Sequence, residues 1–406
     1  MIDLSLKDLK KLYTETYAEK CQKYPQMEEN SDLEAVNRII AIGDLHGDLN
    51  ETINIFKLAR LIEYNDSTGE TKWIGGDTVV VQVGDQIDRC RSLPCSQMKG
   101  DDENSDIKIL KLLTKLHTQA MEHGGAIYSL VGNHELMNVT GRMEYVSPAN
   151  IIDFEKKEEN EQFFKNNPEA SSLKGIEARA WAFKPGNPIA EFLACTRKLV
   201  LKIGSTIFVH AGIVPEIANK YTNLNDLNKI LSLYLWNKLG KPEVFEDVLG
   251  SDVVKGQTLL NRSNVCRDKN CFEISPLWNR EIGRLEDNKE SCNRIFNAIL
   301  HAYGAKRMVV GHTPQIVEGI NSICNRKLIF VDYAASAAFN RADYNIELRG
   351  TRSESRKTQV LEILNDDELN IIKATNSGPS VTKINNREKM NSITKKKRKS
   401  KRSKYI

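Results

Sequence analysis

The sequence lacks the features of membrane and secreted proteins. No stretch approaches the roughly 18 consecutive apolar residues that a membrane-spanning helix needs. The first residues also lack the basic-then-apolar pattern of a secretory signal. We therefore expect an intracellular protein with no membrane segment.

Cysteine pairs with the spacing of zinc ligands are also missing. None of the eight cysteines belongs to a Cys-x-x-Cys unit, which disfavours a zinc site. Two local pairs occur, Cys90 with Cys95 and Cys266 with Cys271. Because a chain of 406 residues does not need disulfides to fold, we interpret the cysteines as reduced or partly buried thiols. The alternative is a redox-sensitive Cys90–Cys95 pair, because this pair abuts one of the polar motifs described below.

Positive charge is concentrated at one end of the chain. The net charge is +4, but eight of the ten residues in Lys395–Lys404 are cationic, so the rest of the chain carries about −4. Low apolar content predicts a disordered basic tail over residues 376–406. Such a tract is typical of segments that bind an import receptor or a polyanion, which fits the cytoplasm or nucleus. A solubilising tail without a partner is the alternative.

The rest of the chain has the pattern of an α/β protein. Residues 1–36 predict an amphipathic helix and a polar connection, as an N-terminal extension. Residues 37–375 predict one large domain with two insertions, a polar and irregular one near 147–200 and a mostly helical one near 220–300. Both insertions could shape a substrate groove.

Six short apolar runs within the large domain predict buried strands. A helix with a broad apolar face is expected between the second and third runs, with Ser105 as its cap and Gly124-Gly125 at its end. Alternation of strands and helices favours a layered α/β or α+β architecture. The predicted strands are residues 39–42, 79–83, 126–131, 206–209, 308–310 and 328–331.

Polar turns that contain glycine follow five of these strands. Four of only seven histidines lie in these turns. The turns are Gly43-Asp44-Leu45-His46-Gly47-Asp48, Gly84-Asp85-Gln86-Ile87-Asp88-Arg89, Gly132-Asn133-His134-Glu135, His210-Ala211-Gly212 and Gly311-His312-Thr313.

The residue types in these turns indicate a metal site. Parallel sheets place ligands at the carboxyl ends of strands, where such turns can converge. A mixture of Asp, His and Asn without Cys suits Mn²⁺, Fe or Zn²⁺. One such turn alone could be an ordinary Asx turn, but five in one chain argue against that interpretation.

The first three motifs, in this order, resemble the signature of the phosphoprotein phosphatase family of calcineurin-like metallophosphoesterases, over residues 37–340. Met137-Asn138-Val139, Tyr145-Val146 and Pro276-Leu277-Trp278-Asn279-Arg280 are more similar to the Shewanella-like branch, and the stretch from Asp85 to Leu113 resembles giant-virus members. The latter would place the protein in a virus-infected host cell.

The resemblance implies a β-sandwich flanked by helices, with two divalent metal ions, most simply Mn²⁺, between the sheets. It assigns Asp44 and His46 to the first ion and Asp85 to both ions. It assigns Asn133, His210 and His312 to the second ion. A water activated between the ions would hydrolyse the phosphate ester.

The resemblance also implies roles for the remaining motif residues. His134 would protonate the leaving oxygen and Asp88 would orient His134. Arg89 and Arg280 would bind the phosphate oxygens, with Asn133 beside them. The sequence departs from the family pattern at Cys90, where glycine is usual, so oxidation at Cys90 is a way in which the enzyme could be inhibited.

Three functions agree with these motifs. The first is hydrolysis of phosphoserine, phosphothreonine or phosphotyrosine in a protein substrate. The second is hydrolysis of a small phosphorylated molecule such as a dinucleoside polyphosphate. The third is a catalytically silent binding protein, which the full set of expected ligands disfavours.

Overall fold

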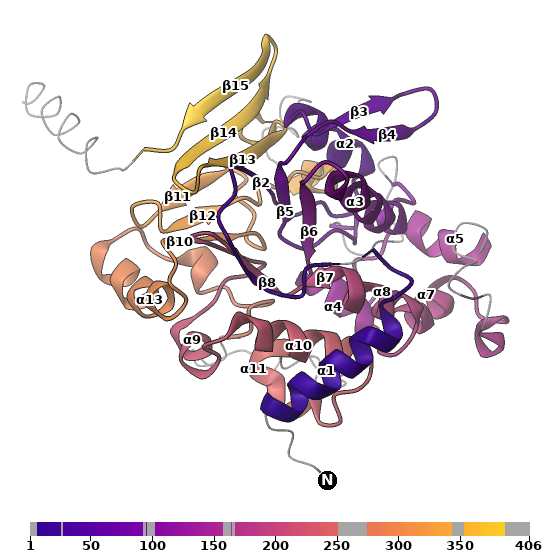
Figure 1. Ribbon diagram of the computed structural model, residues 1–406. Helices are drawn as coiled ribbons and strands as arrows, with labels where there is room; N and C mark the ends of the chain where they lie inside the picture. The colour runs from indigo at the N-terminus through magenta and orange to yellow at the C-terminus, as the bar shows by residue number, and fades with distance from the viewer. Residues whose placement is uncertain are drawn as a thin grey trace, which may run out of the picture.

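The computed structural model describes residues 6–25, 27–91, 95, 102–156, 164, 167–250, 274–342 and 353–385. Two mixed β-sheets pack face to face, and helices surround them (Figure 1). The predicted α/β sandwich flanked by helices is therefore confirmed.

The larger sheet has seven strands in the order β15-β14-β13-β2-β5-β6-β7. Strands β2, β5, β6 and β7 are parallel, whereas β13, β14 and β15 are antiparallel additions at the β2 edge. The bounds are β2 (Arg38–Ile42), β5 (Val79–Gln82), β6 (Ala126–Leu130), β7 (Arg197–Lys198), β13 (Gln359–Leu364), β14 (Glu368–Thr375) and β15 (Gly378–Lys383).

The smaller sheet has six strands in the order β1-β8-β9-β10-β12-β11. Its centre is parallel, because β10 pairs in parallel with both β9 and β12. The bounds are β1 (Asp32–Leu33), β8 (Val200–Ile203), β9 (Thr206–Val209), β10 (Arg307–Val310), β11 (Asn321–Ile323) and β12 (Leu328–Phe330). A separate hairpin pairs β3 (Ile62–Asn65) with β4 (Glu70–Trp73).

All six predicted strands are present, as β2, β5, β6, β9, β10 and β12. Their continuous apolar runs follow from burial on both faces. In the smaller sheet, Phe208, Val309 and Ile329 pack in one core with the larger sheet. Their chain neighbours Ile207 and Met308 point the other way and pack against helices.

Helices cover both outer faces of the sandwich. Helices α2 (Leu49–Leu58) and α3 (Asp106–Met121) share the core of the larger sheet, and seven others pack around the smaller sheet and the site. The bounds of these seven are α4 (Asn133–Val139), α5 (Pro148–Lys156), α7 (Gly175–Phe183), α8 (Pro188–Thr196), α9 (Pro215–Lys220), α10 (Leu224–Leu235) and α13 (Lys289–Ala302). The other helices of the described residues are α1 (Leu6–Lys20) and α11 (Glu246–Leu249), with 3-10 turns η2 (Pro168–Ala170), η3 (Pro242–Phe245), η5 (Ile282–Arg284), η6 (Ala337–Ala342) and η7 (Glu354–Arg356).

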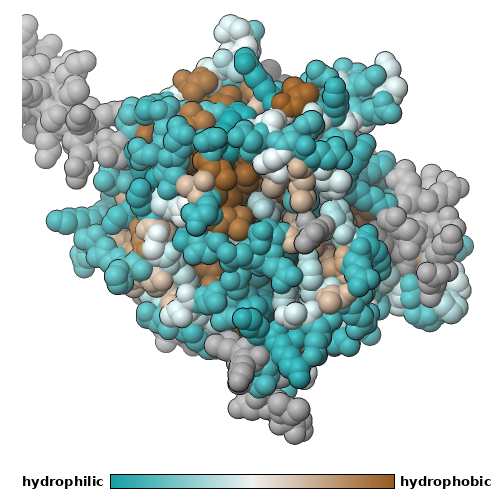
Figure 2. Space-filling view, viewed as in Figure 1, coloured by the Kyte–Doolittle hydropathy of each residue, from teal (hydrophilic) through white to brown (hydrophobic). Residues whose placement is uncertain are grey.

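Two observations concern the apolar character of the helices and of the surface. Among the described residues, no helix combines the length and apolar character that crossing a bilayer requires. Figure 2 shows a face on which hydrophilic residues predominate and apolar residues form a few separate patches.

The prediction of an irregular segment over residues 147–200 was wrong. This segment contains α5, α7 and α8, and it buries Phe154, Phe183 and Leu193 in the core. Two prolines of this segment begin helices rather than break them, because Pro148 and Pro188 occupy first-turn positions where no backbone N–H is required.

The prediction of disorder from residue 376 was also wrong in part. Residues Gly378–Lys383 form β15, an edge strand whose side chains are mostly exposed and which therefore needs few apolar residues. Residues 386–406, with the basic tract, lie outside the described residues.

The N-terminal extension is part of the fold. The expected helix is present as α1, and Leu9 on this helix is 1% exposed. The predicted polar connection then contributes β1 to the edge of the smaller sheet. A disulfide joins Cys21, just after α1, to Cys195 at the end of α8.

Our interpretation of the cysteines as reduced thiols was wrong for six of them. Disulfides join Cys21 to Cys195, Cys90 to Cys95 and Cys292 to Cys324. Spacing could not reveal the first and third, whose partners are 174 and 32 residues apart. Cys266 and Cys271 lie outside the described residues.

The predicted cap of α3 also differs. Ser105 precedes the helix but makes no capping hydrogen bond. Its hydroxyl instead donates to the carbonyl oxygen of Gly47 at 2.6 Å, which ties the start of α3 to the first polar turn.

Candidate functional site

The predicted metal ligands converge at the carboxyl ends of strands from both sheets. The turns after β2, β5 and β6 in the larger sheet carry four of them, and those after β9 and β10 in the smaller sheet carry two. All six are buried, with at most 5% exposure: Asp44, His46, Asp85, Asn133, His210 and His312.

Asp85 lies at the centre of this arrangement. One group of potential ligand atoms belongs to His46, Asp85 and His134, and a second belongs to Asp85, His210 and His312. The two carboxylate oxygens of Asp85 face different groups. Oδ2 is 3.7 Å from His46 Nε2, and Oδ1 is 3.4 Å from His210 Nε2.

Asp44 and Asn133 complete the two groups. Asp44 Oδ2 is 3.8 Å from His46 Nε2, and Asn133 Oδ1 is 3.0 Å from His210 Nε2. All six residues that the resemblance assigns to metal binding thus lie close together, and Asp85 lies between the two groups.

The histidines are oriented as metal ligands are. In each ring, one nitrogen contacts a backbone carbonyl oxygen: His46 Nδ1 that of Ile87, His210 Nδ1 that of Val83, and His312 Nε2 that of Trp278. This leaves the other nitrogen of each ring directed at the site, which is the usual arrangement around a bound ion. His210 Nε2 and His312 Nδ1 then lie 3.1 Å apart, close enough for both nitrogens to bind one ion.

A further carboxylate, Asp332, supports the fit to metal ions. It follows β12, as the ligands follow other strands, and it is 1% exposed. Its Oδ2 has no hydrogen-bond partner within the described part of the chain. A buried oxygen of this kind is costly unless a cation or donor compensates it. The donor set therefore fits two divalent ions.

The pKa shifts of the buried carboxyl groups and of two of the histidines also fit a site that binds cations. Burial, together with the charges of Asp332 and Asp85, raises the pKa of Asp44 well above its usual value. Burial raises the pKa of Asp332 to about 6. Burial also lowers the pKa values of His46 and His312 well below the usual value, so both are neutral and able to coordinate metal. Bound cations would keep the two carboxyl groups ionised.

Glycines allow the turns to approach one another this closely. A Cβ atom on Gly132 would lie 2.1 Å from Asp85 Oδ1, and one on Gly311 would lie 2.2 Å from Asp44 Oδ1. Only glycine fits at these two positions.

The turns also hold four site residues in the left-handed region of backbone conformation. These residues are His46 (φ 43°), Asp85 (φ 53°), Asp88 (φ 71°) and His312 (φ 65°). Such conformations are costly for residues with a side chain, and they are typical of functional sites.

Glu135 holds two of these turns together. Its carboxylate accepts backbone hydrogen bonds from Asp85 at 3.0 Å, Gln86 at 2.7 Å and Gly132 at 2.7 Å. Glu135 belongs to the third sequence motif, but no role was predicted for it. Glutamate at the third position of a helix could have indicated a residue that binds backbone N–H groups.

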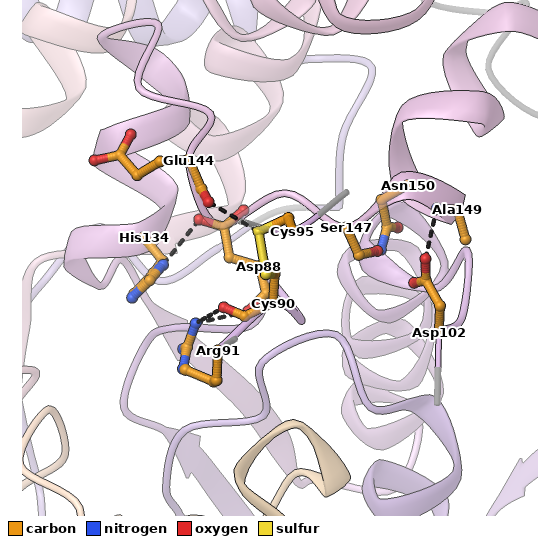
Figure 3. The surroundings of a disulfide bond; sticks show 10 residues. All are labelled: Asp88, Cys90, Arg91, Cys95, Asp102, His134, Glu144, Ser147, Ala149 and Asn150. Carbon is orange, nitrogen blue, oxygen red and sulfur yellow. Dashed lines mark hydrogen bonds and ion pairs between the residues drawn. A yellow bond between two sulfur atoms is a disulfide. The ribbon is translucent and has the colours of Figure 1, made fainter. Parts of the chain in front are cut away.

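His134 and Asp88, the predicted acid pair, lie side by side, with His134 Nδ1 2.8 Å from Asp88 Oδ2 (Figure 3). His134 Nε2 is 3.9 Å from Asp85 Oδ2, at the first metal group. Asn138 Nδ2 donates to the other oxygen of Asp88 at 2.9 Å.

Arg179 on α7 extends this pair into the core. Its Nε donates to Asn138 Oδ1 at 2.8 Å, and its Nη2 lies 2.8 Å from Asp106 Oδ2 and 3.6 Å from Asp88 Oδ1. Sequence reasoning missed Arg179. The available signal was a lone arginine in the otherwise apolar stretch Ala178–Phe183.

The two arginines predicted to bind phosphate lie in different surroundings. Arg89 is 3% exposed, and its guanidinium is 3.3 Å from the carboxylates of both Asp48 and Glu103. Arg280 is partly buried and donates to the carbonyl oxygen of His312 and, at 3.3 Å, to Thr313 Oγ1.

The chain shares its sequence pattern and fold with known proteins. The model of the family described as calcineurin-like phosphoesterase matches residues 37–315. Uncharacterized protein R398 of Acanthamoeba polyphaga mimivirus is 33% identical over 63% of this chain and 96% of its own length. Shewanella-like protein phosphatase 2 of Arabidopsis thaliana is 32% identical over 75% of this chain and 72% of its own.

Solved structures agree with the fold. A cold-active protein-tyrosine phosphatase of a psychrophilic Shewanella species has a TM-score of 0.55 and 19% identity, over 88% of this chain and 83% of that one. The relatives confirm the resemblance to Shewanella-like phosphatases and to a giant-virus protein. The chain belongs to the calcineurin-like phosphoesterase family.

Proposed function

We propose that this protein is a metal-dependent phosphoprotein phosphatase that hydrolyses phosphate monoesters on Ser, Thr or Tyr. One observation carries the proposal: Asp85 lies between two groups of histidine ligands, with the His134–Asp88 pair beside them. This arrangement combines an ion-binding site with an oriented proton donor, the two requirements for hydrolysing an unactivated phosphate ester.

The side chains divide the reaction between them. When bound, two divalent ions would supply an activated water and stabilise the charge on the phosphoryl oxygens. His134 would donate its Nε2 proton to the leaving oxygen. Asp88 holds the ring in place through Nδ1, so that Nε2 remains directed at the site. Arginine side chains would bind the remaining phosphoryl oxygens.

Mn²⁺ is our proposal for the ions, with Fe or Zn²⁺ as the alternatives. Asp44, His46 and Asp85 would hold one ion. Asp85, Asn133, His210 and His312 would hold the other. Carboxylate, amide and imidazole ligands without thiolate suit these metals.

A protein substrate is favoured by relatives whose names describe them as protein phosphatases. A dinucleoside polyphosphate or another small molecule is the alternative. A panel of phosphopeptides beside a dinucleoside tetraphosphate would distinguish the two. Efficient turnover of the dinucleotide alone would contradict the proposal.

The decisive test of catalysis is hydrolysis of an aryl phosphate by metal-stripped protein, with and without Mn²⁺. We expect turnover only with metal, and its collapse in Asp85→Asn and His134→Asn. His301→Asn, an exposed histidine outside the site, is the matched control and should retain full activity. Absence of turnover with every divalent metal tried would instead favour a catalytically silent binding protein.

For the basic tract Lys395–Lys404, we propose an import receptor or polyanion as partner, in a protein that resides inside the cell. Eight cationic residues in ten support this proposal. Deleting residues 391–406 should change the distribution of the protein in cells, and an unchanged distribution would contradict it.

A further inference from the structure

A third arginine, Arg91, lies beside the metal ligands. Its guanidinium contacts the ring of His46 and hydrogen-bonds to the carbonyl oxygens of Asp88 at 3.1 Å and Cys90 at 2.9 Å. The same group lies over two aromatic rings, 5.4 Å from the centre of Tyr145 and 5.0 Å from that of Phe339. Sequence reasoning gave it no role.

The charge of Arg91 is compensated differently from that of Arg89. The Arg89 guanidinium lies 3.3 Å from each of two carboxylates, Asp48 and Glu103. Within the described ranges, Arg91 has no carboxylate at ion-pair distance, and its partners are two carbonyl oxygens, an imidazole and two rings. Among the described residues, its positive charge therefore has no directly contacting carboxylate.

Arg280 shares this property on the opposite side of the site. It donates to the carbonyl oxygen of His312, just as Arg91 contacts His46, and it too has no carboxylate at ion-pair distance in the described part of the chain. Both guanidinium groups interact electrostatically with the central Asp85. Two arginines that contact no carboxylate of the described residues thus lie beside the two metal groups, Arg91 at His46 and Arg280 at His312.

The position of Arg91 is fixed by its surroundings. The backbone N–H of Cys90 donates to the carbonyl oxygen of Tyr145 at 3.0 Å, and the disulfide with Cys95 holds the same residue. Figure 3 shows Arg91 and His134 on one side of this disulfide, and Asp102 and Asn150 on the other. Contact with aromatic faces restrains a guanidinium without neutralising it.

We propose that Arg91 binds the phosphoryl oxygens of the substrate, opposite Arg280. The planar guanidinium can donate two parallel hydrogen bonds to a phosphate. The negative charge of the phosphate would compensate the positive charge of Arg91. Arg89, held by Asp48 and Glu103, stays a predicted phosphate-binding residue. The proposal rests on the phosphatase function proposed above.

The test compares Arg91→Ala and Arg91→Lys with Arg294→Ala, an exposed arginine of α13 paired with Glu281. KM and kcat for an aryl phosphate are measured on Mn²⁺-loaded protein. Isothermal titration gives the Kd of inorganic phosphate, and elemental analysis gives the metal content. We expect the phosphate Kd and the KM to rise about 10- to 100-fold in Arg91→Ala, with unchanged metal content. Arg91→Lys should recover part of this loss, and Arg294→Ala should match wild type.

Two results would overturn the proposal. The first is an unchanged phosphate Kd in Arg91→Ala. The second is loss of metal from that variant in proportion to the loss of phosphate binding, because Arg91 would then position His46 rather than bind phosphate. If wild type binds phosphate but hydrolyses no ester, the proposed function fails, while the titrations still decide the role of Arg91.

Discussion

The two sheets contribute to the site in different ways. Three consecutive strand-end turns of the larger sheet supply Asp44, His46, Asp85 and Asn133, together with the acid pair His134–Asp88. The smaller sheet supplies single residues, His210, His312 and Asp332, from the ends of β9, β10 and β12. The predicted proton donor and four predicted metal ligands are thus combined on the larger sheet, whereas the smaller sheet carries predicted or possible ligands alone.

The largest loss of turnover should come from changing Asp85, which belongs to both groups of potential metal ligands. Asp85→Asn should reduce turnover by more than the roughly 10⁴-fold that loss of a general acid can cost, because both metal groups lose a ligand. His312→Asn should remove only the ion on the smaller-sheet side. Metal content per chain checks this difference. Equal losses of metal in the two variants would contradict the central position of Asp85.

The second-largest loss of activity should come from His134→Asn, which tests the predicted proton transfer. His134→Asn should reduce hydrolysis of an alkyl phosphate such as phosphoserine by about 10²- to 10⁴-fold. An aryl phosphate, whose leaving group needs little protonation, should be affected much less. Steady-state kinetics with both substrates checks this, and equal losses would show that His134 is a metal ligand rather than the acid.

A smaller loss of kcat should follow when Arg179, which contacts Asn138 and Asp88, is replaced. Arg179→Met should lower kcat about 10- to 100-fold, as supporting residues behind a site do, because Asn138 and Asp88 lose a buried partner. It should also destabilise the fold by about 3–5 kcal/mol, since Asp106 is left as an unpaired buried charge.

The double variant Arg179→Met with Asp106→Asn separates these two consequences. Neutralising Asp106 should restore much of the thermal stability but not kcat. Recovery of both would mean that Arg179 acts on stability alone.

The smallest effect should come from the disulfide beside Arg91. Replacing Cys90 and Cys95 by serine should raise KM only a few-fold and cost roughly 2 kcal/mol of stability, because the loop it closes is short. The control is the same change at Cys292 and Cys324, which close a longer loop and are not members of either group of ligand atoms around Asp85. It should cost roughly 4 kcal/mol and leave KM unchanged. Chemical denaturation and steady-state kinetics check both, and a matching rise in KM in the control would contradict a specific role for the Cys90–Cys95 bond.

The sequence predicted those features that are encoded locally. Each strand end carries its ligand within a few residues, so the apolar run and the following polar turn identify both the strand and the site residue. Asp44, His46 and Asp85 could be assigned for this reason, and the structure brings them together.

The features that were missed depend on contacts between distant residues. Arg179 supports Asp88 across 91 positions, and Cys21 meets Cys195 across 174. No local pattern indicates such pairings. The helices within residues 147–200 were missed for a related reason. The effect of a proline depends on whether it lies in the first turn of a helix or within it.

The pairing of β2 with β13 has a consequence for how the protein acquires its activity. Strand β2, which directly precedes Asp44, forms its antiparallel ladder with residues 361–364. During synthesis β2 therefore remains an open sheet edge until residues 361–364 emerge, after every predicted metal ligand has been synthesised. Pairing over such a sequence separation is slow, and exposed edges favour aggregation. The nascent chain thus carries a full set of ligands before it has a rigid site, and early exposure to metal would favour binding by incompletely folded chains.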